Sequence, residues 1–333
     1  MKHDPAPPSS VDVLVVGAGP IGIASALECQ RRGLSVRVVE KGAVVNSLVG
    51  YPTDLEFFST PELIEIGGYP LTTAGYKPVR AEALDYYRRV AQRERLDLRL
   101  GERVLRVDGT DGAFEVVTAK GVHHARKVVV ATGFFDCPNR LGVPGEHLPH
   151  VTHYFKEPYP YADRRVVVVG AKNSAAQVAL ACYRHGADVT LVHRGPALTD
   201  SIKYWIKPDL ENRIRDGAIR ALFDTAVERI TPDAVHLQTP GGPEVLPADA
   251  VLAMTGYHPD FSFLRQLGID LVGEAEEPAY DPETMETNRA GVYVAGVVCG
   301  GRKTSRWFIE NGRDHAAVIA RHAADTVETA AAA

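Results

Sequence analysis

Three glycines near the amino-terminal end of the chain have the spacing of a phosphate-binding turn. Gly17, Gly19 and Gly22 directly follow the apolar stretch 11–16. The first glycine permits a tight turn, the second lets the backbone approach a pyrophosphate, and the third lets a helix pack closely on a strand. Glu40 ends the next apolar stretch, where a carboxylate can accept hydrogen bonds from an adenosine ribose. This combination predicts a dinucleotide-binding site rather than an ordinary glycine-rich turn.

A second turn of this kind, 170–175 (GAKNSA), follows a stretch of four valines and has one glycine fewer than the fingerprint. Asn173 and Ser174 are favourable helix N-cap residues, and the N-terminus of a helix attracts phosphate. The next apolar stretch ends in His193 and Arg194, a basic pair that favours the 2′-phosphate of NADP. The pattern predicts an NADP(H) site, and the alternative is a solvated pair of charges at a strand end.

Two shorter segments resemble each other. Ala131-Thr132-Gly133 and Thr255-Gly256-Tyr257 each follow an apolar stretch and contain small residues. Glycine at such a strand end lets the chain pass close to a flat cofactor.

The alternation of short apolar runs with helical patterns predicts an α/β fold with two Rossmann-type dinucleotide-binding domains. Expected strands are 11–16, 35–40, 127–131, 166–169 and 188–193, and expected helices are 20–32, 80–95 and 174–185. Between the last helix of the first half and strand 127–131, turns at 109–112 and 120–121 predict a β-meander. The strands 250–254 and 292–295 lack a helical partner, so we expect both to complete the first sheet. Segment 157–160 is the expected interdomain linker.

The composition narrows the class of protein. The chain has 333 residues, 45% of them hydrophobic and 24% charged, which is typical of globular proteins of about two domains. A net charge of −5 gives no reason to expect binding to nucleic acid or to an anionic membrane. The four cysteines are far apart, without CxxC or metal-ligand spacing. We therefore expect a soluble cytoplasmic protein with no metal site and no disulfide framework.

Taken together, the two turns resemble those of thioredoxin-reductase-type flavoproteins, over roughly residues 11 to 315. More closely, the chain is similar to the bacillithiol-disulfide reductase (YpdA-like) family. The motifs that carry this closer resemblance are Tyr51-Pro52-Thr53, Phe57-Phe58-Ser59, Val143-Pro144-Gly145-Glu146, 153–157 (HYFKE), 172–175 (KNSA), Ser201-Ile202-Lys203 and 308–313 (FIENGR).

The resemblance implies a discontinuous FAD domain, 1–150 and 249–333, with an NADPH domain, 151–248, inserted in it. It implies an NADPH-dependent reductase of a small disulfide such as bacillithiol disulfide, or of a small redox protein, acting as a homo-oligomer. The expected FAD contacts are Gly17, Gly19, Pro20, Ile21, Gly22, Glu40, Lys41, Asn46, Tyr51, Pro52, Val104, Thr132, Gly133, Gly296 and Val297. The expected NADPH contacts are Gly170, Lys172, Asn173, Ser174, Ala175, His193, Arg194, Lys203 and Gly256.

The chain departs from these relatives in its thiols. Thioredoxin reductases carry a redox CxxC where this sequence reads 153–156 (HYFK), and the YpdA-like branch often has a cysteine at the position of Ile21. The superfamily's Gly-Asp pair also appears here as Gly296-Val297. The resemblance therefore implies the cofactors but not the usual thiol chemistry.

Two residues remain as candidates for chemistry at the acceptor. Cys299 lies just past Val297, and the adjacent Arg302 and Lys303 would lower a thiol pKa; the alternative is a small apolar residue in a packed turn. His153 would act as a proton donor; the alternative is a solvated histidine in the linker.

Three other functions remain open at this point. A flavin monooxygenase also pairs two dinucleotide folds, although its usual Phe-x-Gly-x-x-x-His linker motif is absent here. An NADPH–ferredoxin or flavodoxin reductase would need no thiol. A flavoprotein that senses NADPH or peroxide without turnover is the third.

Overall fold

The computed structural model describes residues 10–332, which fold as two compact units. The first unit comprises the chain up to Val49, Asp54–Cys137 and the chain from Tyr257 onward. The second comprises Gly50–Thr53 and Pro138–Gly256. The inserted unit is therefore longer at both ends than the expected segment 151–248.

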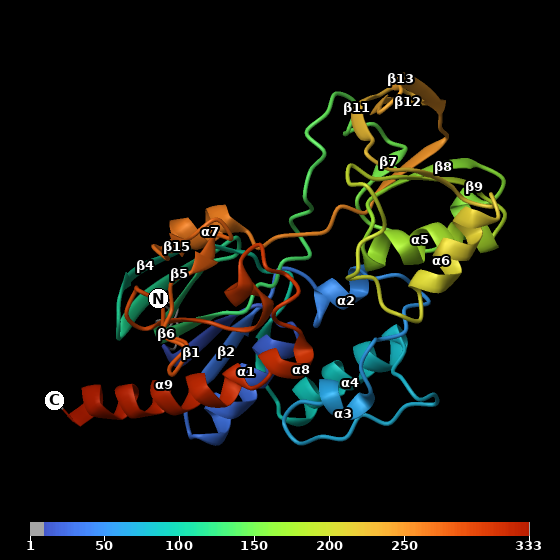
Figure 1. Cartoon of the computed structure of the whole chain (residues 1–333). Helices are drawn as coiled ribbons and strands as arrows, with labels where there is room; N and C mark the ends of the chain where they lie inside the picture. Colours follow the sequence, from blue (N-terminus) through green and yellow to red (C-terminus); the bar gives the residue numbers. More distant parts are fainter. Residues whose placement is uncertain (1–9, 333) are drawn as a thin grey trace, which may run out of the picture. The chain divides into compact units, whose positions relative to one another are not determined.

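Seven strands form the sheet of the first unit. Its order is β3 (Asp97–Arg99), β2 (Val36–Val39), β1 (Val11–Val16), β6 (Val122–Val130), β5 (Ala113–Thr118) and β4 (Val104–Thr110), and β17 (Val292–Val294) also pairs with β6. The long strand β6 joins two kinds of pairing. Its first half is antiparallel to β5, and its second half is parallel to β1 and β17. The expected meander thus continues directly into the parallel sheet (Figure 1).

Helices complete the first unit. The longer ones are α1 (Pro20–Arg31), α4 (Arg80–Arg93) and α9 (His315–Ala332). The short elements are α2 (Asn46–Gly50), α3 (Pro61–Ile64), α7 (Phe261–Gln266), β15 (Leu271–Val272), β16 (Glu277–Pro278), the 3-10 helix η2 (Gly296–Gly300) and α8 (Ile309–Gly312). Proline at the first position of α1 suits a helix start, because its missing N–H would have no partner there. Helix α1 packs against α9, which runs beside it in Figure 1.

The second unit contains a parallel five-stranded sheet. Its order is β10 (Arg220–Leu222), β9 (Asp188–Val192), β8 (Arg165–Val169), β14 (Ala250–Ala253) and β7 (Val151–Thr152). Its helices are η1 (Tyr159–Tyr161), α5 (Asn173–Arg184) and α6 (Lys207–Arg215). A separate antiparallel sheet consists of β11 (Ala226–Ile230), β12 (Ala234–Thr239) and β13 (Gly242–Pro247).

Two expectations about this part of the chain were wrong. Strand β14 pairs with β8 and β7 in the second sheet, whereas only β17 completes the first. Segment 157–160 is not a linker, because it lies inside the second unit and contributes to η1. The physical reason is a shared core: Val251 of β14 is fully buried with residues of β8, β9 and β12, and apolar residues of 141–151 pack against that core. The chain therefore crosses between the units at 137/138 and 256/257, and also on either side of the short segment Gly50–Thr53.

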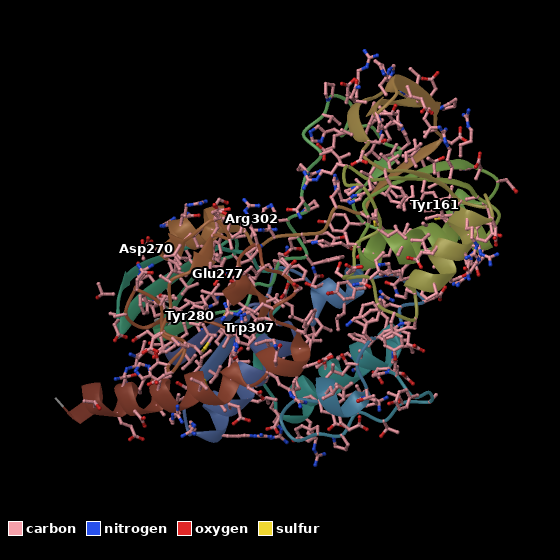
Figure 2. All side chains as sticks on the ribbon, viewed as in Figure 1. Tyr161, Asp270, Glu277, Tyr280, Arg302 and Trp307 are labelled. Atoms are coloured by element: carbon pink, nitrogen blue, oxygen red, sulfur yellow. The ribbon has the colours of Figure 1, made fainter. Side chains whose placement is uncertain are left out.

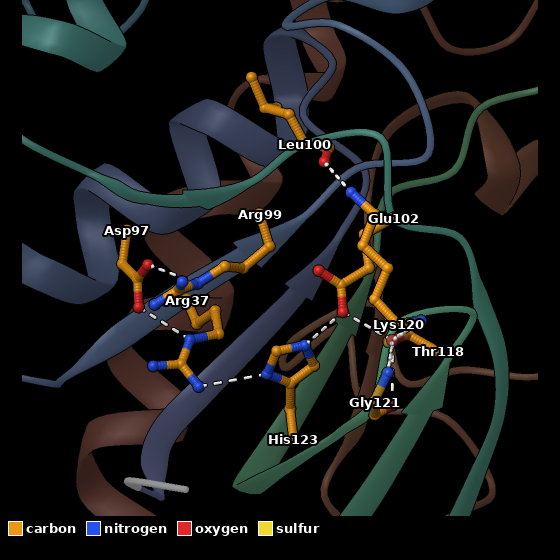
Figure 3. A network of polar contacts seen from close by, with 9 residues as sticks. All are labelled: Arg37, Asp97, Arg99, Leu100, Glu102, Thr118, Lys120, Gly121 and His123. Atoms are coloured by element: carbon orange, nitrogen blue, oxygen red, sulfur yellow. Dashed lines mark hydrogen bonds and ion pairs between the residues drawn. The ribbon is translucent and has the colours of Figure 1, made fainter.

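A polar network links strands β2, β3, β5 and β6 of the first unit (Figure 3). Arg37 on β2 bonds Asp97 on β3 at 2.7 Å and the Nδ1 atom of His123 at 3.2 Å. The other ring nitrogen of His123 lies 2.8 Å from Glu102, which also accepts a 2.6 Å hydrogen bond from Thr118. Since an arginine can only donate, His123 Nδ1 is the acceptor and Nε2 carries the proton toward Glu102.

Candidate cofactor sites and active site

In the first glycine turn, between β1 and α1, two of the three glycines have no room for a side chain and the third has room. Gly17 has φ +107°, and a Cβ added there would lie 2.6 Å from the carbonyl oxygen of Ala131. A Cβ at Gly22 would collide with the carbonyl oxygen of Gly17. A Cβ at Gly19 would meet nothing within 4 Å. Gly17 and Gly22 are therefore required by packing, while the side of the turn at Gly19 is open.

Glu40 is built into this turn. Its carboxylate accepts 2.9 Å and 2.8 Å hydrogen bonds from the backbone N–H groups of Ala18 and Gly42, and the side chain is buried. The Glu40 backbone is fixed by hydrogen bonds with Arg99 and Glu102. A carboxylate offers about four acceptor positions, so these two bonds engage about half of them.

The other expected FAD contacts lie in several different segments of the chain. Lys41 forms an ion pair with Asp136, and the side-chain oxygen of Asn46 accepts a hydrogen bond from the Ala43 N–H. Gly133 follows β6 with φ +71°, and a Cβ there would lie 3.9 Å from Val297. Val104 begins β4. Tyr51 and Pro52 instead belong to the short segment Gly50–Thr53 of the second unit.

Gly296 lies where three segments of the first unit meet. A Cβ added to it would lie 3.0 Å from Ile21 at the start of α1, and its Cα is close to Gly312 of α8. Its backbone N–H donates a 3.1 Å hydrogen bond to Nδ1 of His315. Trp307, labelled in Figure 2, packs edge-on against the His315 ring with centroids 4.4 Å apart. Because Nδ1 accepts this bond, the proton of the neutral imidazole is on Nε2.

The second glycine turn lies between β8 and α5. Gly170 has φ +138°, and a Cβ there would lie 3.1 Å from the Cβ of Ala175. Helix α5 begins at Asn173, so its N-cap is Lys172, and the expected capping by Asn173 and Ser174 was wrong. The Asn173 side chain bonds the backbone of Ser201 and Lys203 instead. This bonding brings the loop before α6 to the N-terminus of α5.

Basic side chains gather at the carboxyl ends of β8 and β9. Lys172, Arg194 and Lys203 are exposed, whereas Lys207 forms a 2.8 Å ion pair with Asp200. Burial, and then the charge of Arg194, lowers the pKa of His193. Gly256, at the end of the segment after β14, has φ +85° and accepts a backbone hydrogen bond from Asn139.

Residues 14–296 match the family model described as pyridine nucleotide-disulphide oxidoreductase. This chain belongs to that family. Bacilliredoxin reductase Bdr of Bacillus subtilis (strain 168) is 43% identical over 310 residues, covering 92% of this chain and 95% of its own length. The resemblance inferred from the motifs is thereby confirmed.

Solved structures agree with this assignment. Bacillithiol disulfide reductase Bdr (YpdA) from Bacillus cereus has a TM-score of 0.93 and 42% identity, covering 96% of this chain and 100% of that one. Thioredoxin reductase from T. acidophilum has a TM-score of 0.74 at 22% identity, with coverage of 96% and 99%, and therefore shares the fold. The fold is that of two dinucleotide-binding domains, and membership of this oxidoreductase family implies FAD and NAD(P)H as cofactors.

Within this pyridine nucleotide-disulphide oxidoreductase, Cys299 does not have the surroundings of a reactive thiol. The residue is completely buried, and burial raises its pKa far above the usual thiol value. The expected help from Arg302 and Lys303 was wrong, because Arg302 pairs with Glu276 and Lys303 pairs with Glu277. Thiolate chemistry requires a lowered pKa and access, so the burial of Cys299 favours the packed-turn alternative.

The surroundings of His153 also differ from those that the sequence predicts. It is buried, not solvated, and its Nε2 lies 2.9 Å from Glu146. Glu146 in turn accepts backbone hydrogen bonds from Leu141 and Gly142 at 2.7 Å and 2.9 Å. Burial lowers the pKa of His153 despite this carboxylate. The pair thus holds the segment that enters the second unit, and a neutral buried imidazole is a poor proton donor to solvent.

Sequence reasoning missed His315 and the bonding role of Asn173. His315 lies two residues after the end of the motif 308–313, and that nearness to a family motif was the available signal. Its contact with Gly296 spans 19 residues along the chain, which no local pattern indicates. In residues 10–332 no set of three or more histidine, cysteine or acidic side chains is arranged to bind a metal ion. Over the same residues, every helix is too short or too polar to span a membrane.

Proposed function

We propose that this protein is an FAD-dependent NADPH oxidoreductase that reduces a low-molecular-weight disulfide such as bacillithiol disulfide. The observation that carries the proposal is the similarity to two Bdr reductases along nearly the whole chain. The two glycine turns, one in each unit, support it with a site for each dinucleotide.

In this proposal the first unit holds FAD. Gly19 leaves room for the pyrophosphate, and Glu40 accepts from the ribose. When bound, FAD would supply the acceptor for a hydride from NADPH and the donor of electrons to the disulfide.

The second unit holds NADPH in this proposal. The turn at Gly170 and the N-terminus of α5 bind the pyrophosphate, and Arg194 and Lys203 bind the 2′-phosphate. Two positive charges beside a dianionic phosphate favour NADPH over NADH through charge-assisted hydrogen bonds.

The overall reaction balances without a protein thiol. One NADPH and one proton reduce one disulfide to two thiols, and NADP⁺ is released. All four cysteines are free, and Cys29, Cys182 and Cys299 are buried. Burial raises the pKa of Cys29 and of Cys182 to about 12, which opposes thiolate formation. In this proposal the bound flavin would supply electrons to the acceptor without a protein thiol, and the chain's residues would bind and orient the two cofactors and the disulfide.

The test is NADPH consumption by the purified protein with a panel of acceptors. We expect a yellow protein that releases FAD on heating and consumes NADPH with bacillithiol disulfide, but much more slowly with ferredoxin or with oxygen alone. Consumption with ferredoxin only would identify a ferredoxin reductase, and an oxygenated product would identify a monooxygenase. A colourless protein that takes up no FAD would refute the proposal. Light scattering of the same sample tests the expected homo-oligomer.

A further inference from the structure

The turn between β3 and β4 is hydrogen-bonded to the backbone around Glu40. The N–H of Glu40 donates to the carbonyl of Arg99, and the N–H of Glu102 donates to the carbonyl of Glu40, both at 2.8 Å. The N–H of Gly101 adds a 3.0 Å bond to the carbonyl of Gly42. The backbone that carries the Glu40 side chain is therefore held by this turn.

The same stretch of backbone determines where the Glu40 carboxylate lies. One carboxylate oxygen accepts from the N–H of Gly42 at 2.8 Å, and the other accepts from the N–H of Ala18, in the first glycine turn, at 2.9 Å. Gly42 is also the residue whose carbonyl accepts from Gly101. A shift of the turn between β3 and β4 would therefore move Gly42, and with it one of the two groups that orient the carboxylate.

The side chain of Glu102 attaches this turn to the sheet. It is buried, and one carboxylate oxygen accepts a 2.6 Å hydrogen bond from the hydroxyl of Thr118 on β5 and lies 2.8 Å from the protonated Nε2 of His123 on β6 (Figure 3). A 3.1 Å bond from the ammonium of Lys120 to the carbonyl of Leu100 holds the other end of the turn, but it is exposed. Because the bonds to Glu102 are charge-assisted and buried, they hold the turn more firmly than the Lys120 contact does.

We propose that Glu102 is a positioning residue for the adenosine half of FAD, because its anchored side chain holds the turn that keeps Glu40 in place to accept from the ribose. This inference rests on the proposed function, in which Glu40 binds the ribose hydroxyls. Glu102 reaches Glu40 through the backbone, and its own carboxylate is bonded to two side chains of the sheet. Loss of Glu102 should therefore weaken recognition of the ribose hydroxyls, whereas loss of a residue that only stabilises the fold would leave that recognition unchanged.

The first experiment measures amide hydrogen exchange in the full-length protein without FAD. Glu102→Leu keeps an apolar side chain of similar size but loses both bonds, so we expect the N–H groups of Gly42 and Gly101 to exchange roughly threefold faster or more. In Glu102→Gln the amide oxygen can still accept both bonds, so exchange should stay as in the wild type. Protection of the amides of β1 and α1 shows that each variant has folded. Unchanged exchange at both glycines in Glu102→Leu would overturn the proposal.

The second experiment compares, by flavin fluorescence, the affinity for FAD with that for its analogue that carries 2′,3′-dideoxyadenosine. The wild type should bind FAD roughly tenfold more tightly than the analogue, because hydroxyl bonds to a carboxylate are charge-assisted. Glu40→Ala should bring this ratio of affinities to about one. Glu102→Leu should lower the ratio roughly threefold or more and Thr118→Val by less, while Glu102→Gln should keep it. Because Glu102 acts through Glu40, the double variant Glu40→Ala/Glu102→Leu should have the same ratio as Glu40→Ala.

Asp111→Asn is the matched control for a general loss of stability. Asp111 lies in the turn between β4 and β5 and pairs with the buried Lys127 of β6 at 2.7 Å. This variant should melt at a lower temperature than the wild type, because it leaves a buried cation without its carboxylate. It should nevertheless keep the wild-type ratio between FAD and the analogue. A ratio lowered as much as in Glu102→Leu would show that the effect reports stability, and would overturn the positioning role.

Two results separate this inference from the proposed function. A wild type that prefers FAD to the analogue, together with an unchanged preference in Glu102→Leu, would overturn the positioning role and leave the reductase proposal standing. A wild type that binds FAD and the analogue equally would refute the proposed ribose contact of Glu40, and this inference with it.

Discussion

His315 and His153 are both buried histidines, and burial lowers the pKa of each. For His315 the pKa falls from 6.5 to about 4, so its imidazole is neutral at physiological pH. That neutrality matters because Nδ1 can accept the hydrogen bond from Gly296 only while it is unprotonated. A single titratable atom thus supports the backbone at an expected flavin contact.

We predict that the free energy of unfolding of the first unit falls as pH drops from 6.5 toward 4. In this window the unfolded state binds a proton that the folded His315 does not, so stability is full above the unfolded pKa and decreases below it. The total effect is roughly 3 kcal/mol at most. His315→Asn keeps a side-chain acceptor without titration, so its urea-unfolding stability should depend less on pH in this window. An exposed histidine, His185, provides the control His185→Asn, and an equal pH dependence in wild type and His315→Asn would contradict the prediction.

At the scale of elements, the turn between β1 and α1 contains glycines that packing requires and one, Gly19, that packing does not require. Gly22 has no space for a Cβ, because the carbonyl of Gly17 occupies it. Gly19 has φ −71°, which any residue adopts, and open space on the side of its missing Cβ. The same fingerprint therefore contains glycines with different physical purposes.

We predict that alanine at Gly22 lowers the stability of the protein, whereas alanine at Gly19 weakens FAD binding. Gly22→Ala should lower the melting temperature of the apoprotein, since overpacking of this kind costs about 1–3 kcal/mol. Gly19→Ala should leave apoprotein stability nearly unchanged and weaken FAD binding roughly tenfold or more, equivalent to about 1.4 kcal/mol. Thermal unfolding of the apoprotein and titration with FAD measure the two effects. If Gly19→Ala bound FAD as tightly as wild type, the open side would not be the pyrophosphate site.

At the scale of the whole molecule, the cysteines are distributed in a way that does not favour a redox relay. Cys29, Cys137 and Cys299 belong to the first unit, and Cys182 to the second. Only Cys137 is partly exposed, and burial raises its pKa as well. Thiol–disulfide exchange needs an accessible thiolate, so the molecule as a whole fits a reductase without protein thiols.

We predict that NADPH reduces the bound flavin normally in Cys29→Ala, Cys137→Ala, Cys182→Ala and Cys299→Ala variants. Turnover with a disulfide should also persist in Cys299→Ala, because that thiol is buried and protonated. Stopped-flow absorbance follows flavin reduction, and NADPH consumption follows turnover, each normalised to flavin content. Normal flavin reduction combined with lost turnover in Cys299→Ala would show that this thiol reacts with the acceptor after all.

Short-range sequence patterns are sufficient to predict several elements of the fold and both glycine turns. Strand 11–16, the glycine turn with Glu40 and the second turn at Gly170 follow from short-range sequence, because a tight turn and a helix start depend on a few consecutive residues. The family that these motifs indicate agrees with the one shown by the similarity of whole chains.

Tertiary structure alone decided the rest. The four residues of β14 are apolar, which predicts that they are buried but does not predict which sheet they join. The core around Val251 places β14 in the sheet of the second unit. Arg302 and Lys303 adjoin Cys299 in sequence, yet they pair with Glu276 and Glu277, so burial rather than charge determines the thiol pKa. Asparagine is a residue type that often caps helices, but the side-chain amide of Asn173 instead donates a hydrogen bond to the carbonyl of Ser201. In each case the deciding contact joins residues far apart in the chain, and such contacts exist only once the chain has folded.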